Sequence, residues 1–277
     1  MDLHQTITDR IIAALETAKA SDWRCPWHRS GGGLPTNARS GKPYRGVNIL
    51  SLWCADQVSG YGDSRWATYR QWAELGAQVR KGEKSSIVVF YKDYETTAED
   101  GEAERRMVAK ASFAFNAQQV DGAPPAEAIP SGGFEPHEAA EQVIRDTGAR
   151  IDHGGATACY IPSADRIQMP DRDRFTSADG YYSTAFHELG HWTGHETRLG
   201  RDLTGRFKSQ AYAGEELVAE LTAAFVTAGL GMATEPHDQS ASYIASWISL
   251  LRDDKKALFT AAAAASKAAD YLTRATG

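Results

Sequence analysis

Residues 187–191 read His-Glu-Leu-Gly-His, and this pentapeptide constrains the fold more than any other segment of the chain. In a helix, residues four positions apart lie one above the other, so His187 and His191 can reach one metal ion only if the segment is helical. Glu188 then faces a water on that ion and can accept its proton. The pentapeptide therefore predicts a metal-binding helix with Glu188 as the general base.

Apolar residues surround the pentapeptide at helical spacing. They form one stripe, which predicts a helix over 178–197 that Ser177 caps and that packs on one side. Gly190 costs such a helix about 1 kcal/mol relative to alanine. Its missing side chain is expected to leave room beside the metal. The alternative is a packed helix that carries two exposed histidines and no metal.

A catalytic zinc site usually has three protein ligands, so a third is expected further along the chain. Glu216 and Glu220 are four residues apart in a helix that we expect to open at Glu215 and to run to about residue 228. One carboxylate can bind the metal while the other accepts a hydrogen bond from a liganding histidine. Glu220 and His195 are alternative ligands. Alternatively, the two adjacent acids 215 and 216 only occupy the first turn, where the helix dipole favours negative charge.

Residues 216–220 resemble the E-x-x-A-D/E signature of gluzincin metallopeptidases. The resemblance implies that Glu216 is the metal ligand and that Glu220 is hydrogen-bonded to a liganding histidine. Glu220 departs from the signature, in which Asp is more usual at this position.

Peptide hydrolysis at such a site also needs a donor to the oxyanion that develops on the scissile carbonyl. Hydroxyl and guanidinium groups near the metal-binding helices are the candidates. These are Tyr181, Tyr182, Tyr212 and Arg198.

Positive charge and tryptophan are concentrated near the start of the chain. Residues 24–92 hold eleven Lys or Arg and four acids, a net charge of +7 in a chain whose total is −6. Cations for phosphates and flat rings for base stacking are typical of single-strand binding. The expected DNA contacts are Tyr44, Arg45, Trp66, Arg70, Trp72, Arg80, Lys81 and Lys84. The alternative is that the tryptophans are core side chains and the cations a solvated face.

The residue pattern divides the chain into two expected domains. Residues 122–135 are rich in proline and glycine and predict a linker between a domain at 1–121 and another at 136–277. The first is expected to be α/β, with helices over 3–19, 48–58 and 69–75 and strands over 86–94 and 106–115 around a polar tip at 95–104. The second is expected to be mostly helical with a small sheet. Its first helix is expected from Pro136 to Gly148, followed by strands near 156–161 and 165–169. Further helices are expected to start at Asp238 or Ser240 and to span 254–274. The fold class is therefore α+β.

Three cysteines are an odd and sparse set, which excludes a disulfide framework and indicates a reducing compartment. No stretch approaches the roughly 18 apolar residues of a membrane span. The first residues do not join a basic segment to an apolar one, so no signal peptide is expected. We therefore expect a cytoplasmic protein with no membrane partner.

Over nearly its whole length the chain resembles ArdC-type antirestriction proteins of conjugative plasmids. The matching residues are Trp23 to Trp27, Asn37 to Asn48, Trp66 to Trp72, Gly76, Val79 to Lys84, Asp165 to Pro170, His187 to Gly194 and Glu215 to Phe225. The resemblance implies an N-terminal domain that binds single-stranded DNA, similar to one in some plasmid primases, and a C-terminal zincin-like metallopeptidase domain. It also implies that the protein protects incoming DNA against the recipient's restriction system.

The expected metal is Zn²⁺, although the same ligands can hold Mn²⁺ or Co²⁺. The expected partners are single-stranded DNA and a protein or peptide substrate, for which a host restriction system is a candidate source. Two other functions stay open. One is a DNA-binding module with a structural or vestigial metal site, and the other is an accessory module for conjugative DNA priming. The intact Glu188 favours the peptidase, because a purely structural site needs no general base.

Overall fold

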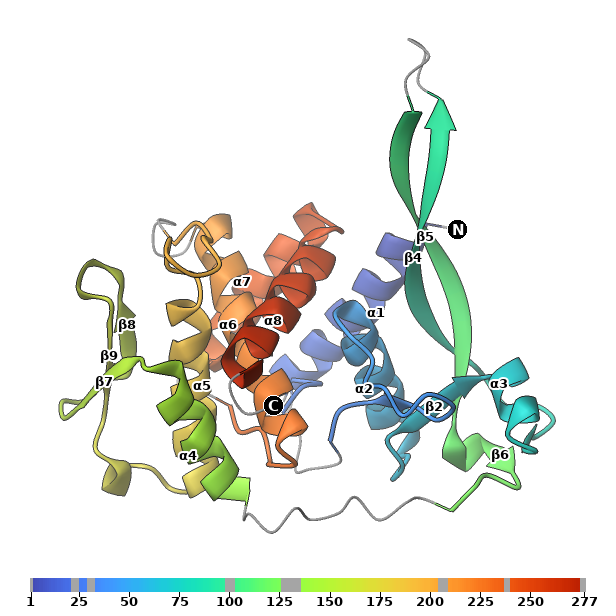
Figure 1. The fold of residues 1–277 in the computed structure, drawn as a ribbon, viewed down its shortest axis with the longest axis horizontal. Helices are drawn as coiled ribbons and strands as arrows, with labels where there is room; N and C mark the ends of the chain where they lie inside the picture. Colours follow the sequence, from blue (N-terminus) through green and yellow to red (C-terminus); the bar gives the residue numbers. More distant parts are fainter. Residues whose placement is uncertain are drawn as a thin grey trace.

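The structure is a computed structural model that describes residues 2–20, 25–28, 33–97, 103–125, 136–203, 209–236 and 240–274. It confirms the α+β class, with helices and three small sheets distributed along the chain. Figure 1 shows the helices of the C-terminal half packed together and a long strand hairpin of the N-terminal half projecting away from the body. No described helix combines the length and the apolar character that a membrane crossing needs.

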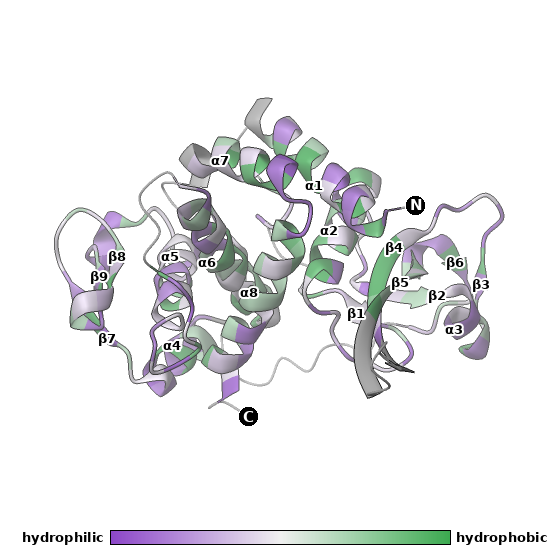
Figure 2. Cartoon of the chain, turned by 90° about the horizontal axis from the view of Figure 1, so that it is seen from above, coloured by the Kyte–Doolittle hydropathy of each residue, from purple (hydrophilic) through white to green (hydrophobic). Residues whose placement is uncertain are grey.

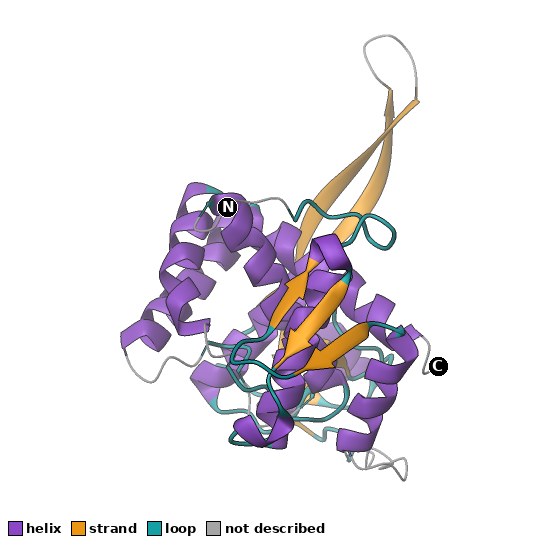
Figure 3. Ribbon diagram, turned by 90° about the vertical axis from the view of Figure 1, so that its left-hand side faces the viewer, coloured by secondary structure: helices purple, strands orange, loops and turns teal. Residues whose placement is uncertain are grey.

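In its described residues, the N-terminal half combines three α-helices with a four-stranded sheet of order β1-β2-β5-β4 and a small β3–β6 pair. Its elements are α1 (Leu3–Ala20), β1 (Thr36–Asn37), α2 (Val47–Ser59), β2 (Arg65–Thr68), α3 (Tyr69–Glu74), β3 (Gln78–Val79), β4 (Ser86–Thr97), β5 (Ala103–Asn116) and β6 (Val120–Asp121). The β4–β5 hairpin is longer than the sequence predicts, since the strands extend into the expected tip at 95–104. Residues 98–102 of that tip lie outside the described residues. Figure 3 shows how far the hairpin rises above the helices.

Local capping explains why α3 begins and ends as predicted. The Thr68 side chain accepts a hydrogen bond from the backbone N–H of Gln71, whose side chain in turn accepts one from the N–H of Thr68. This reciprocal pair is a capping box, which satisfies donors that the first helical turn leaves open. Gly76 then takes a φ of 78°, a conformation that favours glycine, and the chain turns into β3.

Among the described residues, the C-terminal half has five α-helices and a three-stranded sheet of order β7-β9-β8, which packs against α5 at one edge of the molecule (Figure 1). Its elements are α4 (Pro136–Thr147), β7 (Arg150–His153), β8 (Cys159–Ile161), β9 (Arg166–Met169), α5 (Ala178–Trp192), α6 (Gln210–Gly229), α7 (Ser240–Asp253) and α8 (Ala257–Thr273). Strand β7 was not predicted, because its alternating charged residues show no apolar run. It forms because it pairs in parallel with β9. Asp238, one of two expected starts for α7, lies outside the described residues.

Two helix boundaries differ from the prediction by five residues. Helix α5 ends at Trp192 rather than near residue 197, because the chain folds back there and the N–H of Arg201 donates to the carbonyl of Gly194. A Cβ at Gly194 would lie 2.8 Å from the Leu203 side chain and 3.0 Å from the carbonyl oxygen of His191, so a larger residue would require its neighbours in this return to shift. Helix α6 begins at Gln210, where the Ser209 side chain caps the N–H of Tyr212, and not at Glu215.

One hydrophobic core takes residues from both expected domains. Ile7, Ile11 and Leu15 of α1 belong to the same cluster as Ile244 and Trp247 of α7. Figure 2 shows hydrophobic residues along both helices where α1 and α7 lie beside one another. This cluster therefore crosses the expected linker, whereas two other clusters each lie within one half. Most of the linker itself, residues 126–135, lies outside the described residues.

A candidate metal centre and a candidate DNA surface

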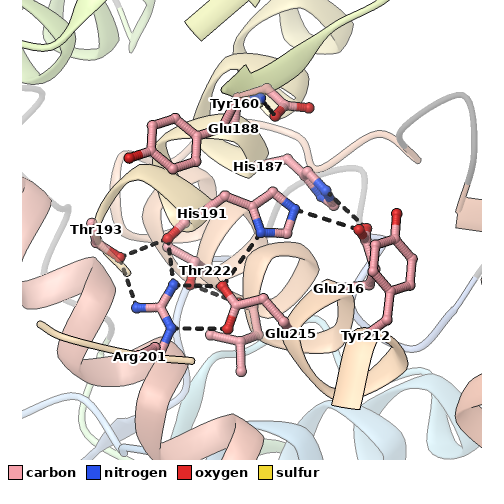
Figure 4. Close-up of polar contacts among 12 residues, drawn as sticks. Tyr160, His187, Glu188, His191, Thr193, Arg201, Tyr212, Glu215, Glu216 and Thr222 are labelled. Atoms are coloured by element: carbon pink, nitrogen blue, oxygen red, sulfur yellow. Dashed lines mark hydrogen bonds and ion pairs between the residues drawn. The ribbon is translucent and has the colours of Figure 1, made fainter. Parts of the chain in front are cut away.

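Helices α5 and α6 bring three potential metal ligands together. His187 and His191 are one turn apart on α5, and Glu216 faces them from α6 (Figure 4). The Nε2 atoms of His187 and His191 lie 3.4 Å and 3.7 Å from the Glu216 carboxylate, and the three ligand atoms are all within 4.8 Å of one another. Two imidazole nitrogens and one carboxylate are a donor set that Zn²⁺ and similar divalent ions accept. The residues therefore fit the expected metal.

The carboxylates around His187 and His191 favour a positive charge between these two histidines and Glu216. Burial by itself lowers the pKa of a histidine, but here the surrounding carboxylates outweigh it. Glu216 and Glu220 raise the pKa of His187 to about 10, and Glu215 and Glu216 raise that of His191 to about 9. Glu216 is buried, which raises a carboxyl pKa, yet the two histidines hold it well below its usual range. A dication can take the place of the imidazole protons.

Each histidine also faces a second carboxylate on α6. The Nδ1 atom of His187 lies 3.4 Å from Glu220, as the gluzincin resemblance implies. The Nδ1 atom of His191 lies 3.3 Å from Glu215, which Arg201 holds through contacts of 2.8 Å and 3.0 Å. The sequence pattern does not predict this role of Glu215, because the contact with Arg201 forms only in the fold. The alternative of first-turn acids is wrong, because α6 begins five residues earlier.

Gly190 lies between the two helices rather than beside the metal site. A Cβ at this position would lie 3.0 Å from the Cα of Ala219 and 3.3 Å from its carbonyl oxygen. The carbonyl of Gly190 accepts hydrogen bonds from the side chains of Thr193 and Arg201. The expectation that the missing side chain leaves room next to the metal is wrong, because glycine here permits the close approach of α5 and α6.

A cavity of about 410 Å³ opens onto the ligands. Glu188 is buried in its wall and accepts a 2.7 Å hydrogen bond from the backbone N–H of Tyr160 on β8. Tyr212 is the one of the four expected oxyanion donors that lines this cavity. Tyr243 also lines it, and the hydroxyl oxygens of the two tyrosines are 3.0 Å apart. Burial and the neighbouring Tyr243 and Glu216 raise the pKa of Tyr212, so the phenol stays protonated.

The other three expected oxyanion donors point elsewhere. Tyr181 bonds to His153, Tyr182 bonds to Glu141, and the Arg198 guanidinium pairs with Asp165 over the ring of Trp192. His195 does not join the ligand cluster either, because it lies beyond the end of α5 and its Nδ1 contacts Thr197.

The rings expected to stack on DNA bases are core side chains. Trp66 and Trp72 are 1% and 0% exposed, and Tyr44 is 7% exposed. The indole of Trp72 donates to the carbonyl of Phe115. These three assignments are therefore wrong in this conformation, because a sequence does not distinguish a tryptophan that packs inward from one that faces solvent.

The expected cations all lie on the surface, but three of them have acidic partners. Arg45 pairs with Asp270 of α8, Arg70 pairs with Glu74, and Arg80 pairs with Glu83. Lys81 and Lys84 are exposed. Their role in DNA binding stays a prediction.

Other aromatic side chains, which the sequence analysis did not select, face outward on one side of the sheet. Tyr69, Tyr91 and Phe113 are each about half exposed, and Phe115 is partly exposed. Phe113 and Phe115 are two residues apart on β5, and Tyr91 pairs with Ala109, so these three residues share a face of the sheet. A shallow depression of about 570 Å³ joins Tyr69 and Phe115 to Arg80 and Lys81. We call these six residues the ring surface.

The comparisons with known proteins cover both halves of the chain. The family model of the N-terminal domain of anti-restriction factor ArdC matches residues 1–120, and that of a zincin-like metallopeptidase matches residues 138–264. The uncharacterized protein y4eC of Sinorhizobium fredii is 46% identical over 281 residues, which are 98% of this chain and 91% of that protein. DNA primase TraC of Escherichia coli is 39% identical over 290 residues, but the match spans 97% of this chain and 27% of the primase.

Two crystal structures of the antirestriction ArdC protein from plasmid R388 have the same fold. The metal-free structure is 40% identical with a TM-score of 0.84, and the match covers 99% of this chain and 98% of that one. The Mn(II)-bound structure is 39% identical with a TM-score of 0.83, and the match covers 100% and 99% of the two chains. The likeness thus extends over both halves, and the chain belongs to the ArdC family of antirestriction proteins, with a zincin-like metallopeptidase domain in its C-terminal half.

Proposed function

We propose that the protein is an antirestriction metallopeptidase that also binds single-stranded DNA and so protects incoming DNA from host restriction. The observation that carries the peptidase is the convergence of His187, His191 and Glu216 beside the buried Glu188 in the wall of one cavity. A structural metal site has no need of a carboxylate that faces a cavity next to the ligands. Membership of the ArdC family supports the antirestriction role.

A divalent cation held by His187, His191 and Glu216 would polarise the scissile carbonyl and lower the pKa of a water in the cavity toward about 7. Glu188 accepts the proton of that water and later donates it to the leaving amine. The N–H of Tyr160 donates to Oε2 of this carboxylate at 2.7 Å and so holds the base in the wall of the cavity. The Tyr212 hydroxyl, kept protonated by its raised pKa, is the donor that we assign to the oxyanion.

The sheet edge beside the cavity favours an extended peptide as the substrate. Strand β8 pairs with β9 on one side only, and its residues Cys159 and Tyr160 line the cavity. An edge strand can take up an extended segment through backbone hydrogen bonds, and because the N–H of Tyr160 already donates to Glu188, such a segment would pair with the other backbone groups of this edge. The substrate that we propose is therefore an unfolded or loop segment of a protein, for which the restriction system of the host is the candidate source.

Glu188→Gln tests whether hydrolysis is part of the function. This variant keeps the size of the side chain but removes the base, so it should bind the cation as the wild type does and should cleave no peptide from a fluorogenic library. Glu138→Gln, at an exposed position of α4, is the matched control and should leave cleavage unchanged. Both are also scored for protection of plasmid DNA entering a restricting host. Wild-type cleavage by Glu188→Gln would remove the peptidase mechanism, and full protection without cleavage would favour DNA occupancy alone.

Single-strand binding is the second function that we propose, and we assign it to the ring surface. Exposed rings beside Arg80 and Lys81 offer stacking platforms and phosphate contacts together. Segment 24–92 carries a net charge of +7, which complements a polyanion.

Phe113→Ala, with Phe90→Ala as its control, tests this surface in the full chain. Phe90 is 49% exposed, but it pairs with Lys110 and therefore lies on the opposite face of the same hairpin. Phe113→Ala should weaken oligonucleotide binding by about 1–3 kcal/mol, because one stacked base loses its platform. Phe90→Ala should not change it. Equal losses in both variants, or none in either, would exclude this face of the sheet as the binding surface.

A further inference from the structure

A short segment of the N-terminal half, Cys25–His28, is buried against the metal centre of the C-terminal half. Trp27 and His28 are 0% and 9% exposed. The Nε2 atom of His28 lies 2.6 Å from Glu220 Oε1, and the indole N–H of Trp27 donates to the same oxygen at 3.4 Å. The other oxygen of Glu220 faces Nδ1 of His187 at 3.4 Å. One buried carboxylate therefore joins the two halves of the chain at a metal ligand.

The hydrogen bonds define the direction of the protons in this series. The backbone N–H of Cys25 donates to Nδ1 of His28 at 3.1 Å, so Nδ1 is the acceptor and Nε2 carries the proton. Nε2 therefore donates to Glu220. The second Glu220 oxygen faces Nδ1 of His187 at 3.4 Å. When a metal ion occupies Nε2, the proton of the neutral His187 ring therefore lies on Nδ1, toward Glu220.

We infer that His28 is a positioning residue of the metal centre, which orients Glu220 and through it the liganding His187. Glu220 is buried, and without the His28 donor its charge would lose the 2.6 Å contact with Nε2 of that histidine. The match to the zincin-like metallopeptidase spans residues 138–264, so His28 lies outside it. The N-terminal half thus supplies a residue that holds the hydrogen-bond partner of a metal ligand, although the ligands themselves are all in the C-terminal half. The inference rests on the proposed metal site but not on peptide hydrolysis.

A double-mutant cycle in the full-length protein tests this inference. Mn²⁺ affinity is measured by competition with a chelator for the wild type, His28→Leu, Glu220→Gln and the double variant. The Co²⁺ absorption spectrum of each reports the ligand geometry. His28→Leu should weaken binding about 10–100-fold, as losses of outer partners of metal ligands do, and should alter the Co²⁺ bands. The double variant should bind no more weakly than Glu220→Gln, because His28 acts through Glu220. Additive losses, or wild-type affinity in folded His28→Leu, would overturn the inference.

Thr8→Val is the matched control for simple loss of contact between the halves. The buried Thr8 hydroxyl of α1 donates to the carbonyl of Lys255 at 3.0 Å, and neither residue lies on α5 or α6, which hold the ligands. This variant should melt at a lower temperature and keep its Mn²⁺ affinity and Co²⁺ spectrum. If it lost as much affinity as His28→Leu, the effect would be one of general stability and the inference would fall.

Two amide variants decide the question if His28→Leu does not fold. Glutamine places an N–H near the position of Nε2, whereas asparagine places its polar atoms near that of Nδ1. His28→Gln should therefore keep Mn²⁺ affinity close to that of the wild type, and His28→Asn should lose it. Equal affinities would overturn the inference. If the wild type itself bound no Mn²⁺, the proposed metal site would fail as well, which separates the two results.

Discussion

At the scale of single residues, the sequence predicts best what depends on local spacing. His187 and His191 are one turn apart by helical geometry, and the structure brings them to Glu216 as the spacing predicts. His28 could not be found in this way, because its contact with Glu220 spans 192 positions of the chain. Trp66 is the opposite case, since its position beside arginines does not reveal that the ring points into the core.

Replacing Glu216 by alanine should weaken metal binding tenfold or more. The change removes one of three protein ligands, and even the loss of an outer partner costs about 10–100-fold. Titration calorimetry with Zn²⁺ or Mn²⁺ measures the change, with Glu138→Ala as the surface control. If Glu216→Ala kept full metal occupancy and Glu220→Ala lost it, Glu220 would be the metal ligand and Glu216 the partner of the liganding histidine.

Metal binding at pH 7 should release protons. The carboxylates hold the pKa of His187 at about 10 and that of His191 at about 9, so both imidazoles carry protons in the metal-free protein at this pH. A metal ligand must be a neutral imidazole, and metal affinity should therefore rise with pH up to about 9–10. In the metal-free protein the raised pKa values stabilise the fold fully below about pH 6.5, and this stabilisation is lost as the pH rises through 9–10.

Calorimetry in buffers with different enthalpies of ionisation measures this release. The observed heat should change with the buffer in proportion to the protons released, up to two per cation. The same heat in every buffer would show that the imidazoles are already neutral.

At the scale of elements, periodicity and capping predicted most of the helices, and errors arose where tertiary contacts set the boundary. Ser177 caps α5 as expected, but the return of Arg201 to Gly194 ends this helix one turn early. Strand β7 has no apolar pattern of its own and exists through its pairing with β9. The close approach of α5 and α6 at Gly190, which sets the distance between the ligands, is likewise invisible in the sequence.

Gly190→Ala should destabilise the protein even though alanine is the better helix former. The added Cβ would lie 3.0 Å from the Ala219 backbone, so α5 and α6 must separate, at a cost of about 1–3 kcal/mol, and Glu216 moves relative to the histidines. Gly214→Ala in α6 is the control, because its Cβ would meet only a Leu250 methyl at 3.9 Å, and it should stabilise the helix by about 0.5–1 kcal/mol. Thermal unfolding measures both, and a Gly190→Ala variant as stable as Gly214→Ala would contradict this packing.

At the scale of the whole molecule, composition indicated two functional halves but not how they are joined. The charge of segment 24–92 and the pentapeptide at 187–191 lie far apart in the sequence, and each matches its own family model. The core nevertheless runs from α1 to α7, and His28 reaches the metal centre. A chain that shares its core in this way has a direct physical link between the half proposed to bind DNA and the half proposed to cleave peptides.

An anomalous difference map from crystals of the full chain grown with Mn²⁺ tests the central claim most directly. One peak should lie between Nε2 of His187, Nε2 of His191 and the Glu216 carboxylate, at about 2.0–2.3 Å from each, with Glu220 still between His187 and His28. A peak at any other set of side chains, or none at a cation concentration that saturates the protein in solution, would contradict the assignment of this site.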